Sequence, residues 1–338
     1  MLIPNKTSRV TTISFGAGTI QQPEPQQQQH FAIETHAYNP FANTTFKHSD
    51  EIRIPIQQQD LYTLPHESFL YVEGKLTKGK VVAAADVILG DNCIAFMFDE
   101  IRYELDSVEI DRNRNVGITS TLKNYAIVSS NRSVILRNAG WLGPTINANG
   151  YFNFCVPLNM LLEFCENYRR VVINAHHKLI FIRTRNDNNC LVGSSALEPK
   201  VDLLKIQWRM PHVLLNKVKK LTMLRTLESG RFVSMGFCSW ELYEFPLLQL
   251  TTKHSWAIKT ATQLEKPRYV VFALQTGRKN IMSEDNSRFD DCKLTNYLAK
   301  TIRDALTLPA IPADPNGIQI SRDRCERWYA LFYGDHHR

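Results

Sequence analysis

The stretch YFNFCVPLNMLLEFCENYRRVVINAHHKLIFIRTRN, residues 151–186, decides the fold because it holds two strands with a short helix between them. Phe152, Phe154 and Val156 alternate with polar positions, which is the period-two pattern of a half-buried strand. Pro157 ends that strand, and leucines at helical spacing over 158–168 predict an amphipathic helix of about three turns. The run LIFI, residues 179–182, predicts the second strand, which a turn at 186–189 closes.

The chain on both sides of this stretch also consists of short predicted strands with a few helices between them. Strands are predicted at 51–56, 68–76, 92–98, 101–110, 201–210, 232–240, 256–260, 269–275, 294–302 and 328–333. A helix is predicted over 116–130, and a second, with one basic side, over 213–228 between Pro211 and a C-cap at Gly230. Short strands at intervals of about ten residues predict an all-β sandwich and argue against a parallel sheet wrapped by helices.

Composition limits the class of protein. The chain has 338 residues, of which 43% are hydrophobic, so it can bury the cores of two domains. Its net charge of +7 is compatible with nucleic acid as an acidic partner and equally with an ordinary basic surface. Seven cysteines without a C-x-x-C pair predict a reducing compartment. With neither an apolar leader nor a long apolar run, we expect neither secretion nor membrane insertion.

Residues 1–48 do not have the composition of a folded domain. The segment QQPEPQQQQ, residues 21–29, cannot bury enough apolar surface to offset the entropy of ordering it. We therefore expect a flexible N-terminal tail.

Residues that could carry chemistry do not form a recognisable set. His176 and His177 are adjacent on or beside a strand, so their side chains should point to opposite faces and should not share a metal ion. Cys238 and Ser239 have no base at a spacing that implies proximity, and Gly16-Ala17-Gly18 lacks the context of a nucleotide-binding loop. We assign no catalytic, cofactor-binding or metal-binding residue, expect no cofactor, and predict that the protein is not an enzyme.

The tryptophans are predicted to lie in the core. They are Trp141, Trp208, Trp240, Trp256 and Trp328. Exposed aromatic residues on a sheet could instead stack on single-stranded bases, but no aromatic cluster interleaved with lysine and arginine stands out in the sequence.

Several of these stretches together resemble a known family. They are FCVPL (154–158), LIFIR (179–183), WAIKT (256–260), PRYVVFALQT (267–276) and FDDCKLTN (289–296). They are similar to the double jelly-roll major capsid proteins, and in particular to the double jelly-roll-like domain proteins of insect genomes and related viral elements. The resemblance implies an all-β fold with short connecting helices, made of two tandem jelly-roll β-sandwiches.

The resemblance also implies a domain layout. We expect an N-terminal arm over 1–48, a first jelly roll over 49–212, a connector helix over 213–230 and a second jelly roll over 231–338. The last range is short for eight strands, so we expect the second roll to be minimal or truncated.

Function is then expected to lie in surfaces. The resemblance implies a capsid-type structural subunit whose pseudo-hexagonal homotrimers pave a shell, in a virion or inside a cell. Non-specific contact with nucleic acid through a basic surface is a further expectation. The alternatives are a monomeric jelly-roll module that binds nucleic acid or carbohydrate, and a domesticated relic that no longer assembles. The stretches WLGP (141–144) and FPLL (245–248) are candidate apolar contact patches, although core burial would explain them equally.

Overall fold

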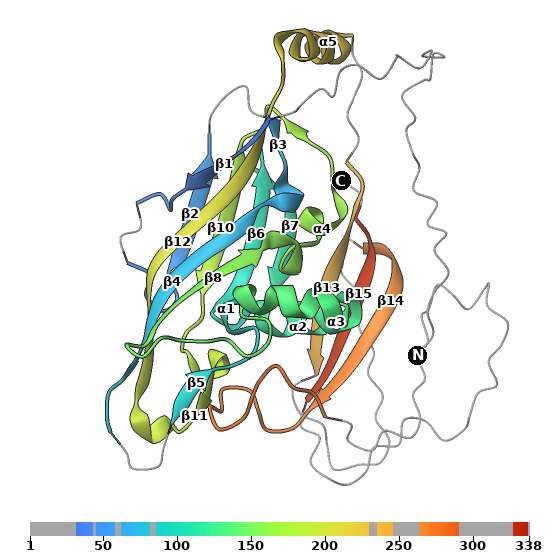
Figure 1. The fold of residues 1–338 in the computed structure, drawn as a ribbon. Helices are drawn as coiled ribbons and strands as arrows, with labels where there is room; N and C mark the ends of the chain where they lie inside the picture. Colours follow the sequence, from blue (N-terminus) through green and yellow to red (C-terminus); the bar gives the residue numbers. More distant parts are fainter. Residues whose placement is uncertain are drawn as a thin grey trace, which may run out of the picture.

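The computed structural model describes residues 32–42, 45–57, 62–81, 86–229, 235–245, 264–290 and 327–336 (Figure 1). It is mostly β, as predicted. Two sheets face each other around a large apolar core, and a third sheet packs against the helices beside them (Figure 1).

The first sheet has the order β8-β4-β12, with β1 on the other edge of β12. Its strands are β1 (Ala32–Tyr38), β4 (Phe69–Lys78), β8 (Tyr151–Pro157) and β12 (Pro199–Leu214). The short strands β3 (Tyr62–Thr63) and β9 (Val172–Ile173) extend it beside the end of β12. All pairings are antiparallel, so the sheet has one face on the core and one toward solvent.

The second sheet has the order β2-β10-β6-β7. Its strands are β2 (Glu51–Ile56), β6 (Phe98–Leu105), β7 (Val108–Arg114) and β10 (His177–Arg183). Along the chain, β1, β4, β8 and β12 belong to the first sheet, and β2, β6, β7 and β10 to the second. These eight antiparallel strands, four in each sheet, cross repeatedly between the two sheets and form a jelly roll.

The core confirms the alternation that the sequence predicted. Phe152, Phe154 and Val156 are buried while Tyr151 is 43% exposed. Trp208 on β12 is fully buried and meets the ring of Tyr103 edge-on, with the ring centroids 5.8 Å apart.

One glycine in β4 is required by this packing. A Cβ atom at Gly74 would lie 2.3 Å from the ring of Phe152 and 2.9 Å from the carbonyl oxygen of Asp202. Only a residue without a side chain lets these neighbouring strands keep their spacing here.

The third sheet has the order β13-β15-β14. Its strands are β13 (Phe237–Phe245), β14 (Leu264–Gln275) and β15 (Arg327–His336). It packs on α2 (Val116–Ile127) through a small apolar cluster of Leu122, Ala273 and Leu331. The ring of Phe237 also meets Phe164 on α4 (Glu163–Asn167) edge-on, with the centroids 5.2 Å apart.

Short elements complete the described residues. They are α1 (Cys93–Phe96), α3 (Ser130–Ile135), α5 (Lys217–Glu228), β5 (Val87–Leu89), β11 (Leu191–Gly193) and the 3₁₀ turns Pro65–Glu67, Leu136–Ala139, Leu158–Met160, Asn188–Cys190 and Ser195–Leu197.

Two predicted elements differ from the structure around α1 and α4. Residues 93–96 form a helix and not part of a strand, because Asn92 turns the chain with φ 56° and its side-chain amide is held by Ser120 and Thr121 at 2.9 Å each. The helix predicted over 158–168 is instead a 3₁₀ turn followed by α4, because Leu162 has an extended backbone, with φ −128° and ψ 136°, between them.

The prediction that Pro211 ends its strand is wrong. β12 continues through Pro211 to Leu214, since the proline carbonyl still accepts a hydrogen bond from the Leu64 amide at 3.0 Å. The helix therefore begins at Lys217 and not at residue 213. It stands at one end of the molecule (Figure 1), with Val218 73% and Leu221 55% exposed, so its apolar side is not buried as an amphipathic helix usually is.

The range expected to be an N-terminal arm includes part of the first sheet. Ala32–Tyr38 forms β1, which pairs with β12 from Ala32 opposite Leu214 to Tyr38 opposite Trp208. The strands predicted at 256–260 and 294–302, Trp256, and all but the first residue of FPLL lie outside the described residues.

Candidate interaction surfaces

The two adjacent histidines point to opposite faces, as predicted. His177 is buried, and its ring nitrogens lie 2.7 Å from the hydroxyl of Tyr103 and 2.9 Å from that of Thr63. Burial lowers the pKa of His177 to about 4. His176 is exposed beside Asp106, at 3.4 Å. His177 thus joins the two sheets through neutral hydrogen bonds, because Thr63 belongs to one sheet and Tyr103 to the other.

A second histidine fastens β1 to β12. Nε2 of His212 lies 3.0 Å from the hydroxyl of Tyr38, and the ring of His36 lies over it with the centroids 4.4 Å apart. Burial lowers the pKa of His212 to about 4.

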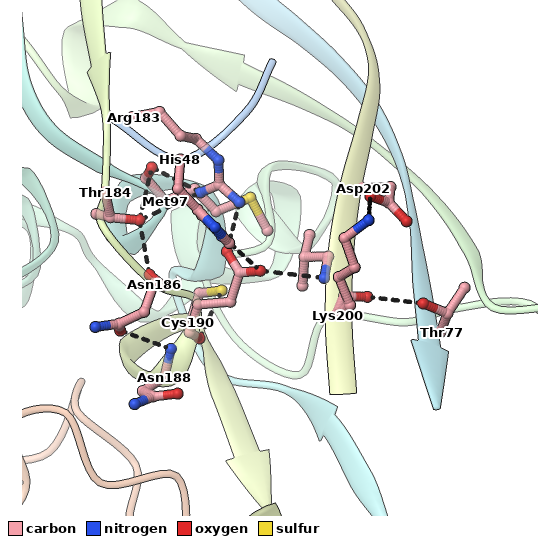
Figure 2. A network of polar contacts seen from close by, with 12 residues as sticks. His48, Thr77, Met97, Arg183, Thr184, Asn186, Asn188, Cys190, Lys200 and Asp202 are labelled. Atoms are coloured by element: carbon pink, nitrogen blue, oxygen red, sulfur yellow. Dashed lines mark hydrogen bonds and ion pairs between the residues drawn. The ribbon is translucent and has the colours of Figure 1, made fainter. Parts of the chain in front are cut away.

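A buried arginine closes the corner where β10 ends and β12 begins (Figure 2). Arg183 is 1% exposed, and its guanidinium donates to the Met97 carbonyl at 2.7 Å and to Asp187 at 2.5 Å. The other carboxylate oxygen of Asp187 accepts from the Val201 amide at 3.1 Å and lies 3.2 Å from Nε2 of His48. Because the Arg183 guanidinium is buried and bonded to groups of the protein itself, this network has a structural role.

A second buried ionic cluster joins α2 to the segment before β9. The Lys123 ammonium pairs with Glu163 and, at 2.7 Å, with Glu166, and donates to the Asn159 carbonyl at 2.6 Å. Burial raises the pKa of Glu163 and that of Asp111, whose carboxylate accepts from the Phe164 amide at 2.9 Å. Lys123 and Glu163 are both almost completely buried, so the cluster offers no group to a substrate.

The outer face of the second sheet, here called the ion-pair face, has its charges matched within the sheet. Arg102 lies 2.9 Å from Glu100, and Lys178 lies 2.7 Å from Glu104. The remaining pairs are Arg53–Glu51, Arg102–Glu51, Arg112–Glu109, Arg112–Glu100 and Arg114–Glu100.

The outer face of the first sheet is different. We call it the cation–aromatic face; its residues are Phe69, Tyr71, Lys75, Tyr151, Lys205 and Arg209. The Arg209 guanidinium lies 4.5 Å from the ring centre of Tyr71, and the Lys75 ammonium lies 4.7 Å from that of Tyr151. The expectation that no aromatic cluster is interleaved with lysine and arginine is therefore wrong.

Part of this face could be read from the sequence. Phe69, Tyr71 and Lys75 stand at alternate positions of one predicted strand. The sequence does not reveal the register between strands, which places Arg209 opposite Phe69 and Tyr151 opposite Lys75. Residues far apart in the chain become neighbours only through this pairing.

The described ranges contain no group of three or more His, Cys, Asp or Glu residues that could hold a metal ion. Within the same ranges, no helix has the length and apolarity to cross a membrane. Cys238 is buried in β13, and Trp141 of the candidate patch WLGP is buried in the core.

The chain shows partial similarity to several solved structures. PBCV-1 VP54, fitted into a reconstruction of the virophage Sputnik, aligns over 75% of this chain and 55% of its own, with 13% identity and a TM-score of 0.45. The Faustovirus major capsid protein aligns over 77% of this chain and 66% of its own, with 8% identity and a TM-score of 0.48. The Sputnik virophage structure aligns over 99% of this chain and 91% of its own, with 9% identity and a TM-score of 0.48. The chain thus spans only about half the length of the first of these.

Among curated proteins, none matches the sequence. Residues 87–333, most of the chain, match the model of the double jelly roll-like domain. This range runs from β5 in the first roll to β15 in the third sheet. The chain belongs to the double jelly roll-like domain family.

Proposed function

We propose that the protein is a structural subunit of a viral or virus-derived shell and associates as a homotrimer of pseudo-hexagonal outline. The observation that carries this proposal is the family match, which runs from β5 within the eight-stranded roll to β15 in the further sheet packed beside it. Two sandwiches side by side in each of three chains present six similar units around a threefold axis, which is the shape that tiles a closed surface. The solved viral structures named above are similar to this chain in architecture only.

Exposed apolar side chains supply candidate contacts between copies. No residue of α3 is buried, and its Val134 and Ile135 are 62% and 74% exposed. On α5, Val218 and Leu221 are similarly exposed. An obligate interface buries about 2,000 Å² or more and is richer in apolar atoms than ordinary surface, so these are residues that a neighbouring copy would cover.

The domain layout remains part of the proposal. We place the first roll before α5, with β1 included in it, and the second roll after α5 in residues 231–338. In this layout α5 is the connector, and residues before β1 form an arm that would contact neighbouring subunits.

The test is the mass of the full-length chain in solution. Light scattering coupled to size exclusion should give three times 38.9 kDa, or a larger shell, at micromolar concentration. Ile135→Lys should shift the mass toward the monomer, because it places a charge in the proposed contact. Ile88→Lys on β5, where the wild-type side chain is 53% exposed, is the control and should leave the mass unchanged.

A monomer of 38.9 kDa at every concentration would refute the trimer. It would favour the alternative of a monomeric jelly-roll module, for nucleic acid or carbohydrate, or of a relic that no longer assembles.

A further inference from the structure

We infer that the cation–aromatic face binds single-stranded nucleic acid. This inference goes beyond the proposed shell function and does not depend on it, because the face belongs to one protomer and needs no second copy.

The side chains of this face come from three adjacent strands, with rings on β4 and β8 and cations on β4 and β12. Tyr71 on β4 lies between Arg209, at 4.5 Å, and Lys205, at 5.6 Å, both on β12. Phe69 lies one outward position along β4, 5.8 Å from the Arg209 guanidinium. Alternate residues of a strand are about 7 Å apart, so the row from Phe69 to Lys75 extends about 20 Å along β4. A row of this length can contact several successive nucleotides.

The cations of this face have no carboxylate partners in the described part of the chain. Neither Lys75, Lys205 nor Arg209 takes part in an ion pair there, and Nε of Arg209 has no hydrogen-bond partner. The two carboxylates nearby are already engaged. Glu73 accepts the hydroxyl of Tyr71, and Asp202 pairs with Lys200 at 2.6 Å. Among the described residues, the face therefore carries three cations against one carboxylate without a cationic partner, Glu73, and keeps a net positive charge, in contrast to the ion-pair face of the other sheet.

Charge and rings together select the partner. Phosphates would supply the acceptors that the three cations lack, and a net charge of +7 would attract a polyanion to the protein. Tyr151 is 43% exposed and Phe69 and Tyr71 are partly exposed, so bases can stack on these rings, which a polyanion without bases cannot do. Duplex DNA hides the faces of its bases inside the helix, so a flat sheet of this kind fits an unpaired strand.

The test uses the full-length chain and a fluorescein-labelled oligothymidylate of about 20 nucleotides, longer than the usual site of one small domain. Fluorescence anisotropy gives Kd at several salt concentrations. The double variant Lys205→Gln, Arg209→Gln should bind at least about tenfold more weakly, and the slope of log K against log salt should fall by about 1.4, or 0.7 for each lost contact. The control Arg53→Gln, Lys178→Gln removes the same charge from the ion-pair face and should change Kd by less than about twofold.

Tyr71→Leu separates stacking from charge. It keeps an apolar side chain but removes the ring, so it should weaken binding of the oligonucleotide by about fivefold or more and leave binding of inorganic polyphosphate unchanged. Equal loss for both ligands would overturn the stacking role. Equal weakening by the Lys205, Arg209 variant and by its control would overturn the assignment of this face.

Particle mass is measured on the same samples. Loss of binding at unchanged mass supports the inference even if the protein proves to be a monomer. Unchanged binding with an altered mass would show that the face contacts another copy of the chain, which overturns the inference without touching the shell proposal.

Discussion

Asp187→Asn should destabilise the fold far more than an exposed Asp→Asn change. The substitution keeps the side-chain shape but removes the charge that faces the Arg183 guanidinium, which is 1% exposed. Removing one partner of a buried ion pair costs about 3–5 kcal/mol because the other charge stays buried without compensation. Arg183 and the Val201 amide donate to different oxygens of the carboxylate, and in asparagine an amide nitrogen, which cannot accept, takes the place of one of them.

Urea unfolding followed by tryptophan fluorescence measures this change. A loss of about 4 kcal/mol should lower the midpoint by about 1.5 M when the slope is between 2 and 3 kcal/mol/M. Asp202→Asn is the matched control, since Asp202 is 42% exposed and its pair with Lys200 contributes at most about 1 kcal/mol. The double variant Arg183→Met, Asp187→Asn should be more stable than the sum of the single changes predicts. A loss below about 1 kcal/mol for Asp187→Asn, or strict additivity, would refute the reasoning.

Three further predictions concern the core. Burial holds the pKa of His177 at about 4, below its usual 6.5. Between these two pH values, His177 is therefore protonated in the unfolded chain but neutral in the folded protein. The contribution of His177 to stability should therefore fall by about 3 kcal/mol as pH drops from 6.5 to 4, and His177→Gln should remove that part of the pH profile in urea titrations while leaving the part due to His212. Gly74→Ala should lower the melting temperature by forcing Phe152 out of place, at a cost of about 1–3 kcal/mol, and calorimetry on the variant checks it. Lys123→Met should lower the stability by about 3–5 kcal/mol, because Glu163 loses its buried cationic partner; a loss below about 1 kcal/mol in urea titrations would contradict this.

The alternating strands were predictable because each pattern is local. Phe152, Phe154 and Val156 need only the period of a strand to be assigned to one face. The helix at 93–96 was missed because its cause is a contact between Asn92 and a helix 28 residues later in the chain. The effect of Pro211 was predicted wrongly because the lack of an amide hydrogen ends a strand only where the neighbouring strand would accept a hydrogen bond from it.

The surfaces were harder to predict than the strands. The opposite placement of His176 and His177 follows from the two-residue period and was confirmed. The cation–aromatic face depends on which strands are neighbours, and β4 and β12 are separated by more than half of the first roll. A single sequence gives the outward residues of each strand but not the strand beside it.

The pairing of β1 and β4 with the last strand of the roll has a consequence during synthesis. β4 emerges from the ribosome early, yet its neighbour β12 follows roughly 120 residues later, at a rate of about 5–20 residues per second. For about ten seconds the edge of β4, and β1 as a lone strand, have no partner within the nascent chain. Long-range pairing of this kind folds slowly and leaves strand edges open to aggregation. Expression of this chain should therefore respond to lower temperature and to chaperones that hold nascent polypeptides, whatever the protein's stability once β12 is in place.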